Sequence, residues 1–138
     1  MIARMLLVLA CSLLSACRTN SMDEVLATDA TQLQLRSVQS RAFDTTDRAL
    51  TTRNVLSTLQ DLGFVVDKVD DTLGTVSGTK MQTYVMRMTV TVRPRGTAQM
   101  LVRASAQLNL NAVSDAQPYQ QFFAALEKAM FLRANEVD

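Results

Sequence analysis

The sequence of 138 residues contains no histidine and no tryptophan, and it has only two cysteines, two prolines and four glycines. Without histidine the chain lacks the commonest general base, the commonest metal ligand and the usual partner of a nucleophilic serine or cysteine. The glycines lie far apart, at positions 63, 74, 78 and 96, and form no glycine-rich phosphate loop. We therefore expect a protein that is not an enzyme and that holds no cofactor and no metal.

The chain also lacks a strong excess of charge and a long apolar run. Its formal net charge is +1, whereas nucleic-acid binding needs a clear basic surplus, so we expect no nucleic-acid partner. The longest apolar run, Met5–Leu14, would rise roughly 15 Å as a helix, about half of a bilayer core of about 30 Å. This run is too short to be a stable transmembrane anchor.

Residues 1–17 instead have the order of a secretion signal. Arg4 gives a positive start, Met5–Leu14 is apolar, and Leu14-Ser15-Ala16-Cys17 ends the segment with small residues and a cysteine. That cysteine makes the segment resemble a bacterial lipoprotein signal, in which cleavage falls between Ala16 and Cys17 and acyl chains on Cys17 anchor the protein. An ordinary secretion signal cut after Ala16, with Cys17 left free, is the alternative.

This interpretation divides the chain into three parts. Residues 1–16 are the expected signal peptide, residues 17–30 a lipidated N-terminus and polar tether, and residues 31–138 a single α+β domain. Loss of residues 1–16 would remove Arg4 and Cys11 but no acidic residue, which leaves 13 basic against 13 acidic side chains. With Cys17 acylated, no disulfide is available, so apolar packing alone must hold the domain.

Local patterns predict two helices and several strands. Residues 31–43 alternate in part and predict a first strand, and a helix is predicted over 47–62 between the cap residues Asp47 and Gly63. Strands are predicted over 64–69 and 73–79, with a turn between them. A last helix opens near Pro118, and its apolar stripe comprises Tyr119, Phe122, Phe123, Leu126, Ala129 and Met130.

The clearest pattern is a hairpin over residues 83–109. Apolar and polar residues alternate on both sides of the connection at 94–98. Pairing Arg93 with Gln99 sets Met88 against Ala104, so that long side chains meet short ones on the apolar face. The element order is then strand, helix, four strands, helix, and one apolar sheet face with two amphipathic helices predicts a two-layer α+β sandwich. Its antiparallel sheet has about five strands, both helices lie on one face, and the other face is polar.

Three groups of residues admit a functional and a structural interpretation. The aspartates could bind calcium or form a solvated turn, the methionines could bind copper(I) or fill the core, and the aromatic residues could form a partner-binding knob or belong to the core. The structural interpretation is favoured for Asp67, Asp70 and Asp71, for Met81, Met86 and Met88, and for Tyr119, Phe122 and Phe123.

The polar face of the hairpin is the candidate interaction face. It carries Arg87, Arg93 and Arg103 together with Thr89 and Thr91. Such a face could bind a carboxylate, a phosphate or a sugar-peptide, or it could be a plain solvated surface of the sheet.

The chain resembles a family of small, largely uncharacterised proteobacterial lipoproteins in four segments: SRAFDT (40–45), VLSTLQDLGF (55–64), GTVSGTK (74–80) and YQQFFAALEK (119–128). The helix followed by Leu62-Gly63-Phe64 and a hairpin is also similar to the helix-grip modules of an accessory lipoprotein in the outer-membrane assembly machine. Arg18 after the cysteine resembles the signal for an outer-membrane destination.

These resemblances imply a lipid-anchored lipoprotein on the periplasmic face of the outer membrane of a Gram-negative bacterium. Its domain is expected to be a non-enzymatic accessory or scaffold of an envelope complex, with the membrane and an envelope protein as partners. The open sheet edge is a second candidate contact surface, because edges can accept a partner strand. A periplasmic lipoprotein that binds a small ligand or a metal is the alternative function.

Overall fold

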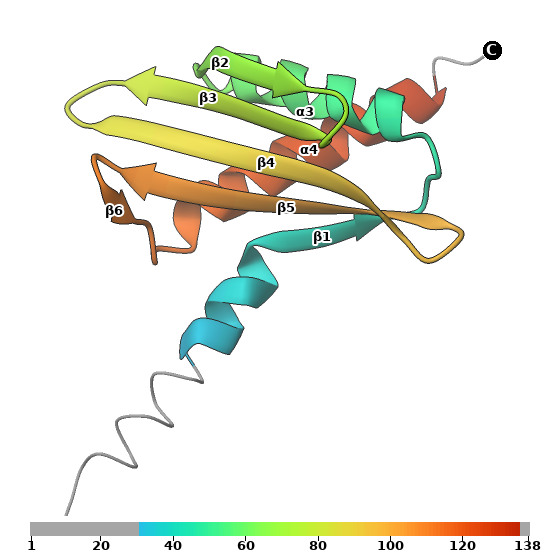
Figure 1. Ribbon diagram of the computed structural model, residues 1–138, viewed down its shortest axis with the longest axis horizontal. Coiled ribbons are helices and arrows are strands. Elements are labelled where there is room, and N and C mark those ends of the chain that lie inside the picture. Colours follow the sequence, from blue (N-terminus) through green and yellow to red (C-terminus); the bar gives the residue numbers. More distant parts are fainter. Residues whose placement is uncertain (1–30, 136–138) are drawn as a thin grey trace, which may run out of the picture. The chain divides into compact units, whose positions relative to one another are not determined.

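The computed structural model describes residues 31–135 (Figure 1). Backbone contacts divide the chain into Met1–Leu33 and Gln34–Asp138, and the fold described here belongs to the second unit. The expected signal peptide, the cleavage site at Ala16 and Cys17, and the tether at 17–30 lie outside the described residues. Within the described residues, no helix is both long and apolar enough to cross a membrane.

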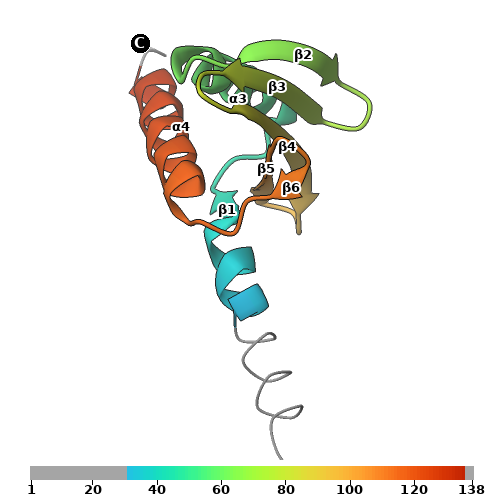
Figure 2. The ribbon, with the colours of Figure 1, turned by 90° about the vertical axis from the view of Figure 1, so that its left-hand side faces the viewer.

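The domain is the expected α+β fold, with an antiparallel sheet and helices packed against it. The sheet order is β1-β5-β4-β3-β2, and β6 pairs with β5 beyond this path. In chain order the elements are β1 (Ser40–Phe43), α3 (Arg48–Asp61), β2 (Val65–Asp70), β3 (Thr75–Met81), β4 (Val85–Arg95), β5 (Gln99–Leu108), β6 (Asn111–Ala112) and α4 (Gln117–Asn135). Helices α3 and α4 lie on one face of the sheet, as Figure 2 shows, and the two-residue β6 is the strand that the sequence did not indicate.

Helix α3 begins and ends where its cap residues predict. The Asp47 carboxylate accepts a hydrogen bond from the Leu50 amide at 2.8 Å, as an N-cap does. At the other end Gly63 adopts a φ of +84°, the left-handed conformation of a C-terminal cap. Val55 and Leu59 are fully buried against the sheet. The helix predicted over 47–62 is therefore confirmed.

The core lies between the sheet and the two helices. Helix α4 contributes its buried aromatic residues, and β4 and β5 contribute alternate side chains. The fully or almost fully buried members are Val55, Leu59, Val76, Met88, Val90, Val92, Val102, Ala104, Ala106, Tyr119, Phe122, Phe123 and Leu126. The apolar stripe of the last helix is thus confirmed as core from Tyr119 to Leu126, and the structural interpretation of Tyr119, Phe122 and Phe123 holds. The apolar hairpin face is confirmed as core over 88–92 and 100–106, whereas Tyr84 and Leu110, predicted on the same face, are exposed.

The predicted register of the hairpin is wrong by two residues. Gln99 pairs with Arg95 rather than Arg93, and Met88 faces Ala106 rather than Ala104. The connection therefore has three residues, 96–98, instead of five. Pro94 is tolerated within β4 because its nitrogen has no hydrogen bond to make. The Val92 amide, two positions earlier on the same side, donates to the Gly74 carbonyl, and Pro94 lies beyond this last bond toward β3. A shift of two keeps every side chain on its predicted face, since the side-chain period of a strand is two.

The predicted first strand is too long at its N-terminal end. Residues 31–38 are helical, and only Ser40–Phe43 form β1. Leu35 and Val38 lie three positions apart, a spacing that suits one face of a helix, and both pack against the core. The irregular alternation of this segment reflected the helical spacing rather than a strand.

Candidate functional site

The five residues of the candidate interaction face lie on one face of the sheet. Arg87, Thr89, Thr91 and Arg93 alternate along β4, and Arg103 lies on β5 opposite Thr91. Neither α3 nor α4 covers this face, because both pack on the other one (Figure 2). At about 3.4 Å per residue, the row from Arg87 to Arg93 extends roughly 20 Å. We call this surface the open face.

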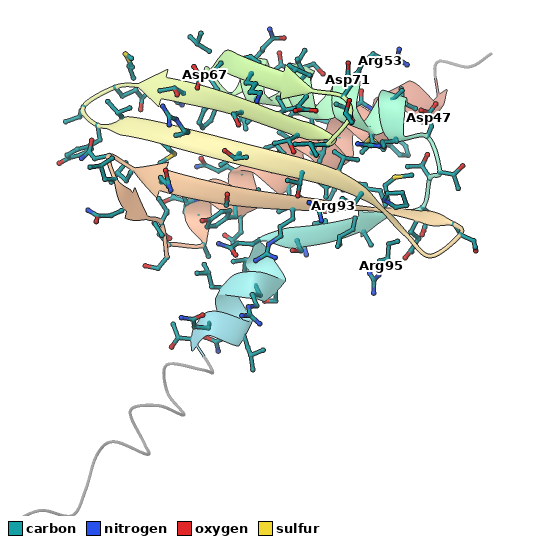
Figure 3. The ribbon with its side chains drawn as sticks, in the orientation of Figure 1. Asp47, Arg53, Asp67, Asp71, Arg93 and Arg95 are labelled. Atoms are coloured by element: carbon teal, nitrogen blue, oxygen red, sulfur yellow. The ribbon has the colours of Figure 1, made fainter. Side chains whose placement is uncertain are left out.

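Among the side chains that the structure describes, the arginines of the open face have no acidic partner. Among the described residues, the one ion pair within 4.0 Å joins Arg41 to Glu127, and it lies on the helix side of the sheet. Arg87, Arg93 and Arg103 are all exposed. Figure 3 shows Arg93 and Arg95 on β4 and Asp67 toward the β2 edge. The positive charge of β4 and β5 is therefore available to a binding partner.

Two hydroxyl groups of the sheet, those of Thr89 and Thr79, take part in cross-strand hydrogen bonds. The Oγ atoms of Ser77 and Thr89 lie 3.2 Å apart, and the Thr79 hydroxyl donates to the Asp67 carboxylate at 2.5 Å. Thr89 and Thr91 are only partly exposed, in contrast to the arginines. The open face thus presents exposed cationic side chains above hydroxyl groups that are partly buried.

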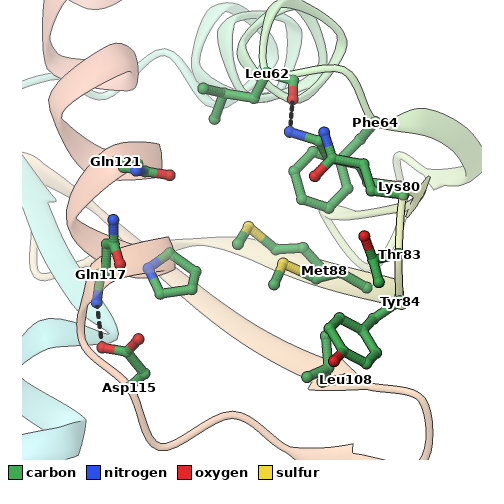
Figure 4. A pocket seen from close by; sticks show the side chains of 13 residues that line it. Leu62, Phe64, Lys80, Thr83, Tyr84, Met88, Leu108, Asp115, Gln117 and Gln121 are labelled. Carbon is green, nitrogen blue, oxygen red and sulfur yellow. Dashed lines mark hydrogen bonds between the residues drawn. The ribbon is translucent and has the colours of Figure 1, made fainter.

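A pocket of about 600 Å³ lies at one end of the sandwich, lined by residues from the end of α3, the start of α4 and the strands β3, β4 and β5 (Figure 4). Its floor is a cross-strand row on the helix side, in which Met86 pairs with Lys80 on one side and with Leu108 on the other. Leu62, Phe64, Met88 and Pro118 complete the apolar lining. This volume lies within the range of small-molecule sites, about 300 to 1,000 Å³.

The rim of the pocket is polar. It carries Lys80, Gln82, Thr83, Tyr84, Asp115, Gln117 and Gln121. The Lys80 ammonium donates to the Leu62 carbonyl at 2.9 Å and lies 5.9 Å from the centre of the Phe64 ring. The Asp115 carboxylate accepts from the Gln117 amide at 3.0 Å. Within the described residues, the side-chain amides of Gln117 and Gln121 make no hydrogen bond, which leaves them for a ligand.

The remaining candidate residues do not form a joint site. Asp67 on β2 accepts from the Thr79 hydroxyl on β3, whereas the Asp70 carboxylate accepts from the Leu73 amide in the predicted turn. Across residues 31–135, no three aspartate, glutamate, histidine or cysteine side chains converge as metal ligands would. Met86 and Met88 share the helix side of β4, but Met81 pairs with Val85 at the end of β3 and is largely exposed.

The pocket is the site that sequence reasoning missed. The alternation in the hairpin put Tyr84 on the apolar face with Met86 and Met88, yet Tyr84 is 60% exposed. A pocket forms where the apolar face of the sheet extends beyond the helices that cover it. Local sequence patterns do not indicate where on the sheet those helices end. No model of a known protein family matches the chain, and no curated protein matches it either.

Proposed function

We propose that the protein is a lipoprotein anchored by Cys17 to the outer membrane, and that its domain faces the periplasm as a non-enzymatic accessory of an envelope complex. The signal-like order of residues 1–17 supports the anchor. The observation that carries the role of the domain is the open face, whose three arginines lack a carboxylate partner among the described residues. Arginine side chains form bidentate bonds with carboxylates, so an acidic protein surface is the partner that fits.

The open face suits this role better than the outer edge of β2. A bulge interrupts the pairing of β2 with β3 between Val66 and Lys68, and Asp67 and Lys68 place charges there. Bulges and charges on an edge strand oppose the addition of a further strand. The face, in contrast, is regular over the full paired length of β4 and β5.

Charge reversal on the open face tests this proposal. We expect Arg87→Glu with Arg103→Glu to leave the fold intact, since both side chains are exposed, and to weaken partner capture by about tenfold. The measurement is the yield of the principal crosslinked protein in cells, with a photo-crosslinking residue in place of Thr89. Arg53→Glu with Lys128→Glu is the matched control, because it changes the charge equally on exposed positions of α3 and α4. Equal crosslink yields in all three proteins would contradict the role of the open face.

The intact mass of the membrane-extracted protein tests the anchor. We expect the wild type to have lost residues 1–16 and to have gained acyl chains at Cys17. Cys17→Ala should stay unacylated and leave the outer-membrane fraction, because several buried acyl chains provide the anchoring. An unacylated wild type of the mature length would show an ordinary secretion signal instead. That outcome would place the protein in the free periplasm.

A further inference from the structure

The pocket at the end of the sandwich has the features of a ligand site rather than of a packing gap. Its floor is formed by Met86 and Leu108, which are only partly buried, and by Met88, which is buried at the edge of the core beneath them. Methionine side chains are flexible and polarisable, and they adapt to apolar ligands of varied shape. An aliphatic chain laid along the row Lys80–Met86–Leu108 would remove this apolar surface from water.

The rim offers donors to the other end of such a ligand. The Lys80 ammonium has three N–H donors and uses one of them for the Leu62 carbonyl. The other two N–H groups are left for a ligand. Gln117 and Gln121 add unpaired amide donors on the α4 side. The single carboxylate among the lining residues, Asp115, is already engaged with the Gln117 backbone. The excess of free donors over free carboxylates favours a head that carries negative oxygen atoms.

We propose that this pocket binds a single-chain amphiphile, with its aliphatic chain on Met86 and Leu108 and its anionic, oxygen-bearing head at Lys80. The site lies on the helix side of the sheet, so it is separate from the open face and does not depend on the function proposed above. A fatty-acid-type carboxylate and a single-chain phosphate share this chemistry. Lys80 has a dual role, because it also bonds the last turn region of α3 through Leu62.

The methionines allow a direct test by NMR, because the methyl groups report from inside and outside the pocket. The full chain is labelled with ¹³C-methyl methionine and held in phosphatidylcholine nanodiscs if it purifies acylated, or in buffer otherwise. Octanoate and octyl phosphate are titrated separately, which distinguishes the two kinds of head. We expect saturable shifts of the Met86 and Met88 methyl signals with at least one of them. The signals of Met100, buried elsewhere in the core, and Met81, exposed outside the pocket, should stay in place.

Two controls separate the head from the chain of the ligand. Octyltrimethylammonium has the same chain with a cationic head and should bind at least tenfold more weakly. Lys80→Gln should weaken binding of the anionic probe by about tenfold, whereas Lys80→Arg should retain it and thus exclude a loss caused by damage to α3. Lys68→Gln, which removes an exposed charge from the β2 edge, should have no effect.

Several outcomes would overturn the proposal. Unchanged Met86 and Met88 signals with both anionic probes, or equal shifts of all methionines, would show that the pocket is not a site. Equal binding of the anionic and cationic probes, or full binding by Lys80→Gln, would refute the anionic head. Because the readout involves neither partner capture nor acylation, its failure is distinguishable from failure of the accessory role.

Discussion

Replacement of Gly74 by alanine is expected to lower the free energy of unfolding by about 3 kcal/mol. Gly74 adopts a φ of +63° in the turn between β2 and β3, and a Cβ atom there would lie 2.5 Å from the Val92 carbonyl oxygen. It would also lie 2.6 Å from Nη2 of Arg48, which donates to the carbonyls of Asp71 and Thr72. The substitution therefore strains the turn and displaces the arginine that ties α3 to it. The measurement is urea unfolding at equilibrium.

Gly96→Ala is the control for this effect. Gly96 has nearly the same φ, +61°, but a Cβ atom there would meet nothing within 4 Å. We expect a loss of about 1 kcal/mol, which is the cost of the left-handed conformation alone. The difference between the two substitutions thus measures the close packing around Gly74. An equal loss of unfolding free energy for both substitutions would show that the close contact of residue 74 with the Val92 carbonyl is relieved without cost.

Removal of one hydroxyl group, by Tyr119→Phe, is expected to cost about 2 kcal/mol. The Tyr119 side chain is fully buried, and its hydroxyl donates to the Val113 carbonyl at 2.8 Å. The same oxygen accepts from the Ala106 amide and from the Gln39 side chain, each at 3.2 Å. On the side of β5 that faces away from β4, this oxygen lies between β1 and β6, neither of which pairs with Ala106. Phenylalanine would leave that buried amide without an acceptor.

Two measurements isolate this role. The urea midpoint should fall for Tyr119→Phe, and hydrogen exchange at the Ala106 amide should accelerate more than at its neighbours in β5. Tyr84→Phe is the matched control, because Tyr84 is the other tyrosine of the chain, is 60% exposed, and makes no side-chain hydrogen bond with any described residue. A stability of Tyr119→Phe equal to that of Tyr84→Phe would show that the hydroxyl is dispensable.

Elements with signals at both ends were predictable from the sequence. Asp47 and Gly63 bracket α3, and the buried aromatic residues of α4 repeat at helical spacing. The hairpin shows where such reasoning stops: alternation assigns Val90 and Val92 to the core face in any register shifted by an even number. Only the length of the connection separates these registers, and Pro94 suggested a wider turn than the three residues that form it.

The candidate site divides in the same way. The open face could be predicted, because Arg87 and Thr89 lie at alternate positions and their side depends on period alone. The pocket could not, since it arises where α4 begins relative to the ends of β3 and β4, and that offset follows from three-dimensional packing. Lys80 shows why the pocket could not be predicted. A lysine at the end of a strand is typical of a solvated position, but Lys80 pairs with Met86 on the helix side and donates to the Leu62 carbonyl.

The place of β1 in the sheet has a consequence for the order in which the domain assembles. Strands β2 to β5 are joined in sequence order, so each pairs with a neighbour that is already close along the chain. Strand β1 skips three strands to pair with β5, and the bond from Gln39 to Tyr119 spans 80 positions. Such contacts form late, because a long loop must close before they contribute. During synthesis, which starts at the N-terminus, β1 therefore stays unpaired until β5 has been made. The bond between Gln39 and Tyr119 can form only after α4 has been made as well.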